Sequence, residues 1–153
     1  MQKIVPNLWF DGNAEEAVNF YASVFSDGKI ISTEHYPNSA DEGLADFQQN
    51  LAGKVLTMEF EIFGTRFVAI NGGPEFTFTE AVSFTVPCKD QDEIDYFWDK
   101  LSSVPESEQC GWCKDKYGLS WQIVPENMDE LMKKPDAFKT LMAQHKIVIA
   151  EYE

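Results

Sequence analysis

Hydrophobic and polar residues alternate strictly along two stretches of the chain. Residues 54–63 read KVLTMEFEIF and residues 119–124 read LSWQIV. A period of two is typical of a β-strand with one buried face and one open face. The similar tetrapeptides EIFG and DKYG end in Gly64 and Gly118, 54 residues apart, where glycine favours a tight reversal. The sequence therefore predicts one kind of hairpin built twice.

Two amphipathic helices are repeated in the same way. Residues 14–25 and 90–101 carry apolar residues three and four positions apart and acidic residues in their first turns. Asn13 is the expected N-cap of the first helix. Each helix follows a short β-rich stretch, at residues 4–10 and 81–87. The chain is therefore expected to contain two repeats of one strand, one helix and three strands.

This pattern predicts an α+β fold made of two βαβββ repeats in a single domain, 1–153. Repeat one covers about residues 1–74, repeat two about 79–125, and a C-terminal helical extension 126–153. In repeat one, residues 29–36 are β-rich and residues 38–53 form a polar stretch that we expect to be a mobile loop. The second repeat lacks most of that stretch, so its middle strand, near residues 106–110, is expected to be short.

The last 28 residues are expected to be mostly helical. Two short helices are predicted at residues 127–134 and 136–144, separated by Pro135. Residues 146–153 are predicted to be either a tail or a final strand.

Charge narrows the range of partners. The 153 residues carry 26 acidic and 12 basic side chains, a net charge of −14, with no basic cluster. Such a chain repels nucleic acid and anionic membranes, so neither is an expected partner. No segment is apolar enough to span a membrane or to act as a secretion signal, which leads us to expect a cytoplasmic protein.

The three cysteines do not indicate a disulfide framework. Cys110 and Cys113 form a CxxC motif, which redox enzymes and zinc sites also contain. On a strand, however, residues three apart point to opposite faces. We therefore favour structural or incidental thiols over a redox or metal role.

Five sequence strings together resemble one known family. They are FDGNAEEAVNFY at residues 10–21, NGGP at 71–74, AVSFTVPC at 81–88, DQDEIDYFWDKL at 90–101 and GWCKDKYGLSWQIVP at 111–125. The chain resembles the PhnB-like family, often labelled 3-demethylubiquinone-9 3-methyltransferase, of the vicinal oxygen chelate superfamily. That superfamily includes glyoxalases, bleomycin-resistance proteins and extradiol dioxygenases. The resemblance implies a cupped antiparallel sheet from each repeat, outer helices, an inner ligand cleft and a homodimer.

The resemblance also implies where a metal would bind. In metal-dependent relatives four strand positions supply the ligands, and they fall here on Pro6, Val68, Ser83 and Gln122, each to within one residue. Pro6 and Val68 have no donor side chain, and one hydroxyl and one amide do not hold a divalent ion against water. We therefore expect no cofactor and no tightly bound metal. If a divalent metal does bind, its candidate ligands are Glu59, Glu61 and Gln122.

The remaining candidates lie on the open strand faces. Our ligand-binding candidates are Glu59, Arg66, Ser83, Trp112 and Gln122. Arg66, the only arginine, would either anchor an anionic group of a ligand or pair with Glu59 or Glu61. Tryptophan and phenylalanine side chains, among them Trp9 and Phe76, would suit a flat ligand. No residue is assigned a catalytic role.

Two functional hypotheses remain open, and the sequence does not decide whether the protein is an enzyme. The first is a metal-free protein that binds a small aromatic or planar molecule. The second is a metal-dependent lyase, isomerase or dioxygenase. Methyl transfer is least favoured, because the glycines at residues 72–73 precede no convincing helix, as a nucleotide-type methyl donor site would require.

Overall fold

A computed structural model describes residues 2–153. The chain divides into two compact units, Met1–Thr77 and Phe78–Glu153. The first unit contains repeat one, and the second contains repeat two together with the C-terminal extension. Each unit is described by itself below.

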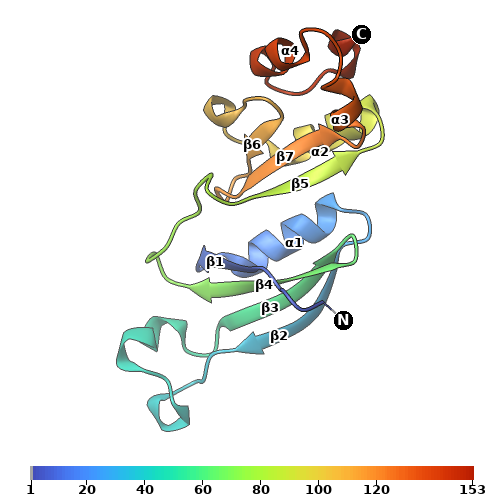
Figure 1. The fold of residues 1–153 in the computed structure, drawn as a ribbon. Helices are drawn as coiled ribbons and strands as arrows, with labels where there is room; N and C mark the ends of the chain where they lie inside the picture. Colours follow the sequence, from blue (N-terminus) through green and yellow to red (C-terminus); the bar gives the residue numbers. More distant parts are fainter. Residues whose placement is uncertain (1) are drawn as a thin grey trace. The chain divides into compact units, whose positions relative to one another are not determined.

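The first unit is a four-stranded sheet with one helix on it (Figure 1). The strand order is β1-β4-β3-β2, with β1 parallel to β4 and the other pairs antiparallel. Helix α1 brings the chain back before β2 starts, so β1 and β4 run the same way and the sheet is mixed rather than wholly antiparallel. The elements are β1 (Asn7–Asp11), α1 (Ala14–Val24), β2 (Lys29–His35), the 3-10 turns η1 (Ala40–Glu42) and η2 (Asp46–Leu51), β3 (Val55–Ile62) and β4 (Thr65–Gly72).

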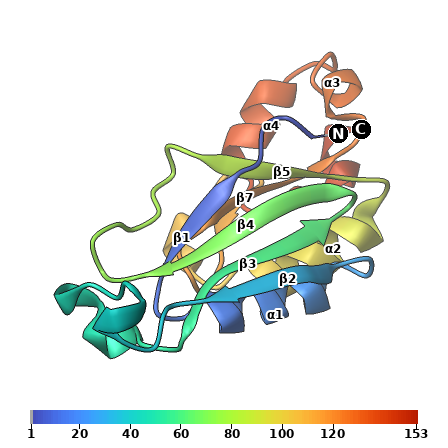
Figure 2. The same ribbon diagram turned by 90° about the horizontal axis from the view of Figure 1, so that it is seen from below.

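Buried and half-buried residues alternate along β3 and β4, and α1 packs on the face that carries the buried ones (Figure 2). Met58, Phe60 and Phe67 are buried, whereas the residues between them are only half-buried. The Tyr21 ring of α1 stacks 6.1 Å from Phe60, which stacks 5.4 Å from Phe67. Aromatic burial of this kind contributes about 1.5–3 kcal/mol for each side chain. It fixes one face of the sheet as core and leaves the other open.

Asn71, near the end of β4, joins β4 to α1, to β3 and to Tyr36, which follows β2. It is 5% exposed, and its side-chain oxygen accepts a hydrogen bond from the Ala14 backbone N–H at 3.2 Å. Its side-chain nitrogen donates to Val55 O at 2.9 Å, and its carbonyl accepts from the Tyr36 hydroxyl at 2.8 Å. The expected N-cap, Asn13, makes no side-chain capping bond. A side chain distant in sequence satisfies the start of α1 instead.

The second unit has a three-stranded sheet of order β5-β7-β6, again with a parallel pair, β5 and β7. The short strand expected near residues 106–110 is reduced to a single bridge between Gln109 and Trp112, because Pro105 starts a 3-10 turn there. The α+β class is confirmed, but repeat two is βαββ. Its elements are β5 (Ser83–Cys88), α2 (Gln91–Leu101), η3 (Pro105–Ser107), β6 (Trp112–Lys114) and β7 (Ser120–Pro125).

The two similar tetrapeptides make different turns. Phe63 and Gly64 both have positive φ, of 51° and 75°, and form a two-residue hairpin loop. The second loop is longer, and there only Gly118 has positive φ. Asp115 is fully buried, and its carboxylate supplies the hydrogen-bond acceptors for N–H groups in and beside this loop. Its Oδ1 accepts from the N–H groups of Tyr117 and Leu119 at 2.9 and 3.1 Å, and its Oδ2 accepts from the Trp121 indole at 2.9 Å.

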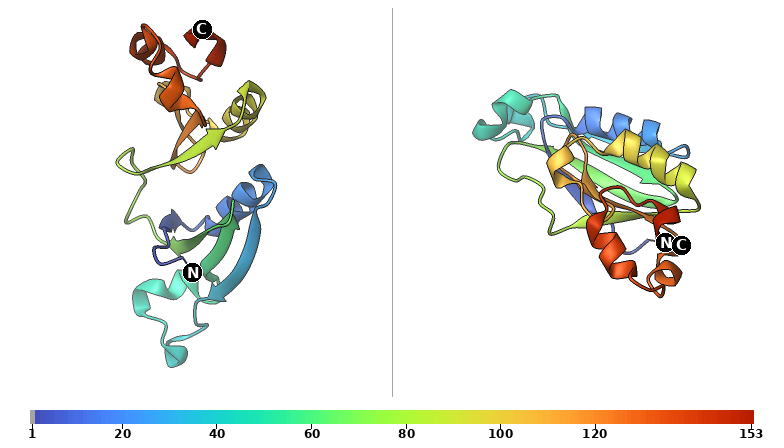
Figure 3. Two further views of the ribbon diagram at one scale, coloured as in Figure 1. Left: turned by 45° about the vertical axis from the view of Figure 1, so that its right-hand side comes forward. Right: turned by 90° about the horizontal axis from the view of Figure 1, so that it is seen from above.

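The C-terminal extension packs on repeat two within the second unit (Figure 3). Its elements are α3 (Met128–Leu131), α4 (Ala137–Ala143) and η4 (Ile149–Tyr152). The helices are shorter than expected, and residues 146–153 are neither a strand nor a loose tail, because Ile147 and Tyr152 are buried in a cluster with Leu131 and Ala137. Gln144 organises this segment, since its side-chain oxygen accepts from the Tyr152 hydroxyl at 2.9 Å.

Replacing Asp115 by alanine should lower the free energy of unfolding by about 3 kcal/mol or more, because two buried N–H donors and one partly buried N–H donor lose their acceptor. Glu61 occupies the matching position in the other hairpin and is paired with the exposed Lys29 at 3.2 Å, so Glu61→Ala should cost less than about 1 kcal/mol. Urea unfolding of both variants measures the difference. Equal losses would contradict the role assigned to Asp115.

Candidate ligand-binding faces

The open face of the first sheet is defined by strand register. Glu59 pairs with Val68, and Val68 pairs with Asn7, so these three side chains lie on the face opposite α1. Trp9 and Ile70 are paired in the same way one step further along. The face is therefore apolar towards β1 and charged towards β2.

The charges of this face are paired with one another. Arg66 Nε lies 2.7 Å from Glu59 Oε1, and Lys29 Nζ lies 3.2 Å from Glu61 Oε2. The Arg66 Nε–H has no acceptor with hydrogen-bond geometry, so the first contact is an ion pair only. Of the two roles considered for Arg66, the structure shows the pairing. A ligand anion near Arg66 would compete with Glu59 for its charge.

The open face of the second sheet brings three candidates together. The Gln122 side chain donates a 2.9 Å hydrogen bond from Nε2 to Ser83 Oγ. Trp112 of β6 pairs with Gln122 in register, so the half-buried indole lies on the same face as the amide. Thr85 of β5, which is exposed, is the other neighbour of Gln122. The group offers amide and hydroxyl oxygens beside an aromatic ring.

Ser120 adds a feature that the sequence did not single out. Its side chain is 1% exposed, and its hydroxyl has no hydrogen-bond partner within residues 2–153. It lies on the open face between Ser83 of β5 and Lys114 of β6, and Lys114 is ion-paired with Glu80. That ion pair, through its hydrogen bond, holds the pKa of the exposed Glu80 carboxyl below its usual value. A buried hydroxyl without a hydrogen-bond partner destabilises the fold. No hydrogen bond among residues 2–153 therefore accounts for a serine at position 120.

The four positions at which the resemblance implies metal ligands can be located within the two units. Pro6 precedes β1, and its carbonyl accepts from the Val68 N–H at 3.0 Å, which makes Asn7 the residue beside Val68 on the open face. Asn7 donates its amide to Val5 O. Within either unit, residues 2–153 gather no group of three His, Cys, Asp or Glu side chains able to hold an ion. One amide and one hydroxyl, at Gln122 and Ser83, are a poor donor set.

The aromatic side chains have separate roles. Trp121 is 4% exposed and belongs to the core with Phe84, 5.9 Å away. Trp9 lies on the open face of the first sheet, with its ring 4.9 Å from Phe76 in an edge-on contact. Trp112 is the half-buried indole of the second sheet. The aromatic wall expected from the sequence is thus divided between the two units.

The cysteines are not a redox pair. All three are free thiols; Cys113 is buried against α2, whereas Cys110 has a positive φ of 55° in the preceding turn, 3.6 Å from the Met142 sulfur. Burial raises the pKa of the Cys113 and Cys88 thiols to about 12, with help from nearby carboxylates. These two thiols stay protonated and unreactive at neutral pH.

A comparison with known families and structures gives a consistent result. The sequence model of a family described as 3-demethylubiquinone-9 3-methyltransferase matches residues 2–124. A solved PhnB protein from Bacillus cereus, described as a putative 3-demethylubiquinone-9 3-methyltransferase, is 37% identical with a TM-score of 0.62, covering 80% of this chain and 99% of its own. PA1353 from Pseudomonas aeruginosa, 16% identical over 82% of this chain and 98% of its own, shares the fold with a TM-score of 0.53. No curated protein matches.

The fold and these matches define a protein of the vicinal oxygen chelate class. Within that class, the chain belongs to the PhnB-like, or 3-demethylubiquinone-9 3-methyltransferase, family. The resemblance read from the sequence strings is confirmed.

None of the helices within residues 2–153 combines the length and the apolar character needed to cross a lipid bilayer.

The thiols should react in a fixed order. At pH 8 a thiol with a pKa of about 12 is ionised to roughly one part in ten thousand, so Cys88 and Cys113 should resist alkylation in the folded protein. Cys110, which is partly exposed, should be labelled first. Iodoacetamide labelling followed by peptide mass spectrometry tests this order. Rapid native labelling of Cys113 would contradict its burial.

Proposed function

We propose that this PhnB-like protein binds a small aromatic or planar molecule on the open face of its second sheet, without a catalytic metal. Gln122 would orient the ligand through its side-chain oxygen, because its Nε2 already donates to Ser83. Trp112 would contact the flat surface of the ligand, since aromatic rings favour stacked or edge-on contact. The hydrogen-bonded pair of Gln122 and Ser83 beside a half-buried indole is the observation that carries the proposal.

The open face of the first sheet has a secondary place in this proposal. Glu59 and Arg66 are ligand-binding candidates that neutralise each other at 2.7 Å. Such a partly exposed pair contributes at most about 1 kcal/mol, so a ligand with its own carboxylate could compete for Arg66 at modest cost.

The metal-free part of the proposal is supported by the donor set. Gln122 and Ser83 are the only side chains with oxygen donors at the four implied positions, and Glu59 and Glu61 are each held by a cation. A metal-dependent lyase, isomerase or dioxygenase is the alternative. It would recruit Glu59, Glu61 and Gln122, and it would require both ion pairs to open.

Methyl transfer, which the family description names, has little support in these residues. β4 ends at Gly72, and Gly73 is followed by a turn and an irregular segment up to β5, not by a helix. Gly72 also lies beneath the Trp9 ring, where a Cβ would overlap the indole. The glycines serve close packing rather than a phosphate cradle.

A cytoplasmic homodimer is the assembly that we propose, on the strength of the resemblance.

Metal content tests the first part of the proposal. Protein purified without chelator or affinity-tag metal should contain no stoichiometric zinc, nickel, manganese or iron by elemental analysis. A metal that binds the native state raises the melting temperature. If no metal binds, micromolar additions of these metals should leave the melting temperature unchanged. Stoichiometric metal, or a rise in melting temperature that Glu59→Gln removes, would establish the metal-dependent alternative.

Ligand binding tests the second part. A set of planar aromatic acids and alcohols, screened by saturation-transfer NMR, should yield ligands that quench tryptophan fluorescence. Gln122→Ala and Trp112→Ala should weaken these ligands about tenfold, the loss of one hydrogen bond or one ring contact. Gln49→Ala, at an exposed glutamine of η2 whose side chain makes no hydrogen bond within residues 2–153, is the matched control and should change nothing. Equal binding by all three variants would remove the proposed site.

A further inference from the structure

A separate cavity lies in the first unit, beneath the 38–53 segment that the second repeat lacks. Its volume is about 350 Å³, at the lower end of the range for small-molecule sites. The walls come from the ends of β1 and β4, from η2 and from the residues just after β4. All of these belong to the first unit. The cavity therefore does not depend on the open face of the second sheet.

The floor of the cavity is an aromatic surface. The Trp9 ring lies across Gly72, where any Cβ would overlap it, and its Nε1 donates to Gly73 O at 2.9 Å. Phe76 holds the indole by an edge-on contact at 4.9 Å. The indole N–H is thus already used within the protein, and the ring lines the cavity as an aromatic surface. A π-face is the electron-rich part of an aromatic side chain.

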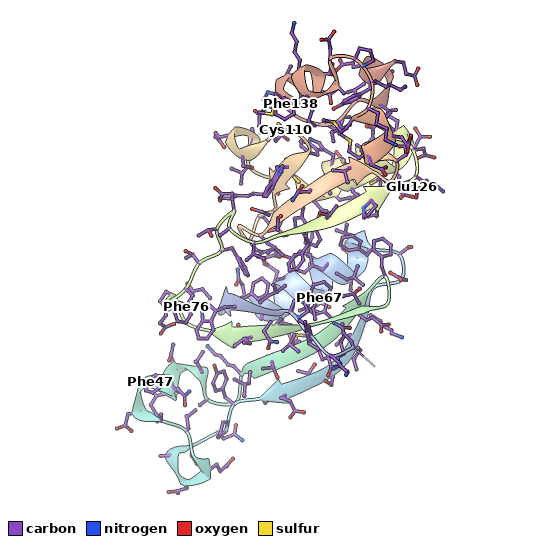
Figure 4. The ribbon with its side chains drawn as sticks, viewed as in Figure 1. Phe47, Phe67, Phe76, Cys110, Glu126 and Phe138 are labelled. Carbon is purple, nitrogen blue, oxygen red and sulfur yellow. The ribbon has the colours of Figure 1, made fainter. Side chains whose placement is uncertain are left out.

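The mouth of the cavity carries an exposed aromatic side chain. Phe47 of η2 lines the cavity although 82% of its surface is exposed (Figure 4). Nothing within residues 2–153 covers this ring. A ligand in the cavity would bury part of it.

Two carboxylates and a tyrosine oxygen are among the polar groups that line the cavity, together with side-chain amides and one lysine. The Tyr36 hydroxyl donates its proton to Asn71 O at 2.8 Å, which leaves its oxygen lone pairs available. Asp11 and Glu75 add two carboxylates, and neither has an ion-pair partner among residues 2–153. Burial, followed by the charge of Glu75, raises the pKa of Tyr36, so this hydroxyl remains neutral. Lys54 is the one cation in the lining, against two acids.

We propose that this cavity binds a small organic cation, an amine or quaternary ammonium group, between the Trp9 ring and the carboxylates of Asp11 and Glu75. Aromatic faces attract ammonium groups by about 0.5–2 kcal/mol each, and the carboxylates add a Coulomb attraction. The net charge of −14 concentrates such cations near the protein. Lys54 opposes the cation and limits its affinity.

Choline and its neutral isostere, in which carbon replaces the nitrogen, are the matched probes. Choline should shift the Trp9 indole N–H resonance in a saturable way, and the neutral isostere should not at the same concentration. Asp11→Asn and Glu75→Gln should each weaken choline about three- to tenfold. Lys54→Gln should strengthen it by a similar factor, because a like charge leaves the lining.

Matched controls separate this site from general electrostatics. Asp99→Asn changes the net charge equally but lies exposed on α2, so it should leave choline binding unchanged. Phe47→Ala should weaken choline, whereas Phe138→Ala, 67% exposed on α4, should not. Equal binding of the neutral isostere, or equal effects of the control variants, would overturn the cation site. Gln122→Ala should not affect choline, so failure here is distinguishable from failure of the proposed function.

Discussion

The second unit depends on one buried carboxylate. Asp115 has no exposed surface, yet it accepts three hydrogen bonds, two from its own turn and one from the Trp121 indole in the next strand. Burying a charged group costs several kcal/mol unless donors surround it. The three donors therefore fix the turn, the start of β7 and the orientation of the core tryptophan together. The polar face of β7, with Gln122, is placed by the same constraint.

The first unit uses an amide for a comparable purpose. Asn71 satisfies the start of α1, the start of β3 and the hydroxyl of Tyr36 from one buried position. Asparagine has both donors and an acceptor, so it can join a helix N-terminus to a strand carbonyl, which a carboxylate cannot do. The two repeats thus share a strand, a helix and a final pair of antiparallel strands, but not the polar residue that secures them.

The differences between the repeats are also where ligands would bind. Unit one keeps the 38–53 segment, and with it a cavity floored by Trp9. Unit two lacks a full second strand, and its open face carries the Gln122 and Ser83 pair. Membership of the PhnB-like family explains the common frame. The chemistry of each surface comes from side chains that the shared fold does not use for its core packing.

The sequence by itself determined the family, the existence of two similar units and the sides of β3 and β7 that face the core, because a period of two and tandem similarity are local properties. It also placed Gln122 and Ser83 on open faces. Only the tertiary structure decided that Asn71 rather than Asn13 caps α1, that Arg66 is paired with Glu59, and that Ile147 and Tyr152 are buried. Each of these depends on contacts between residues distant in the chain, which alternation and spacing do not specify.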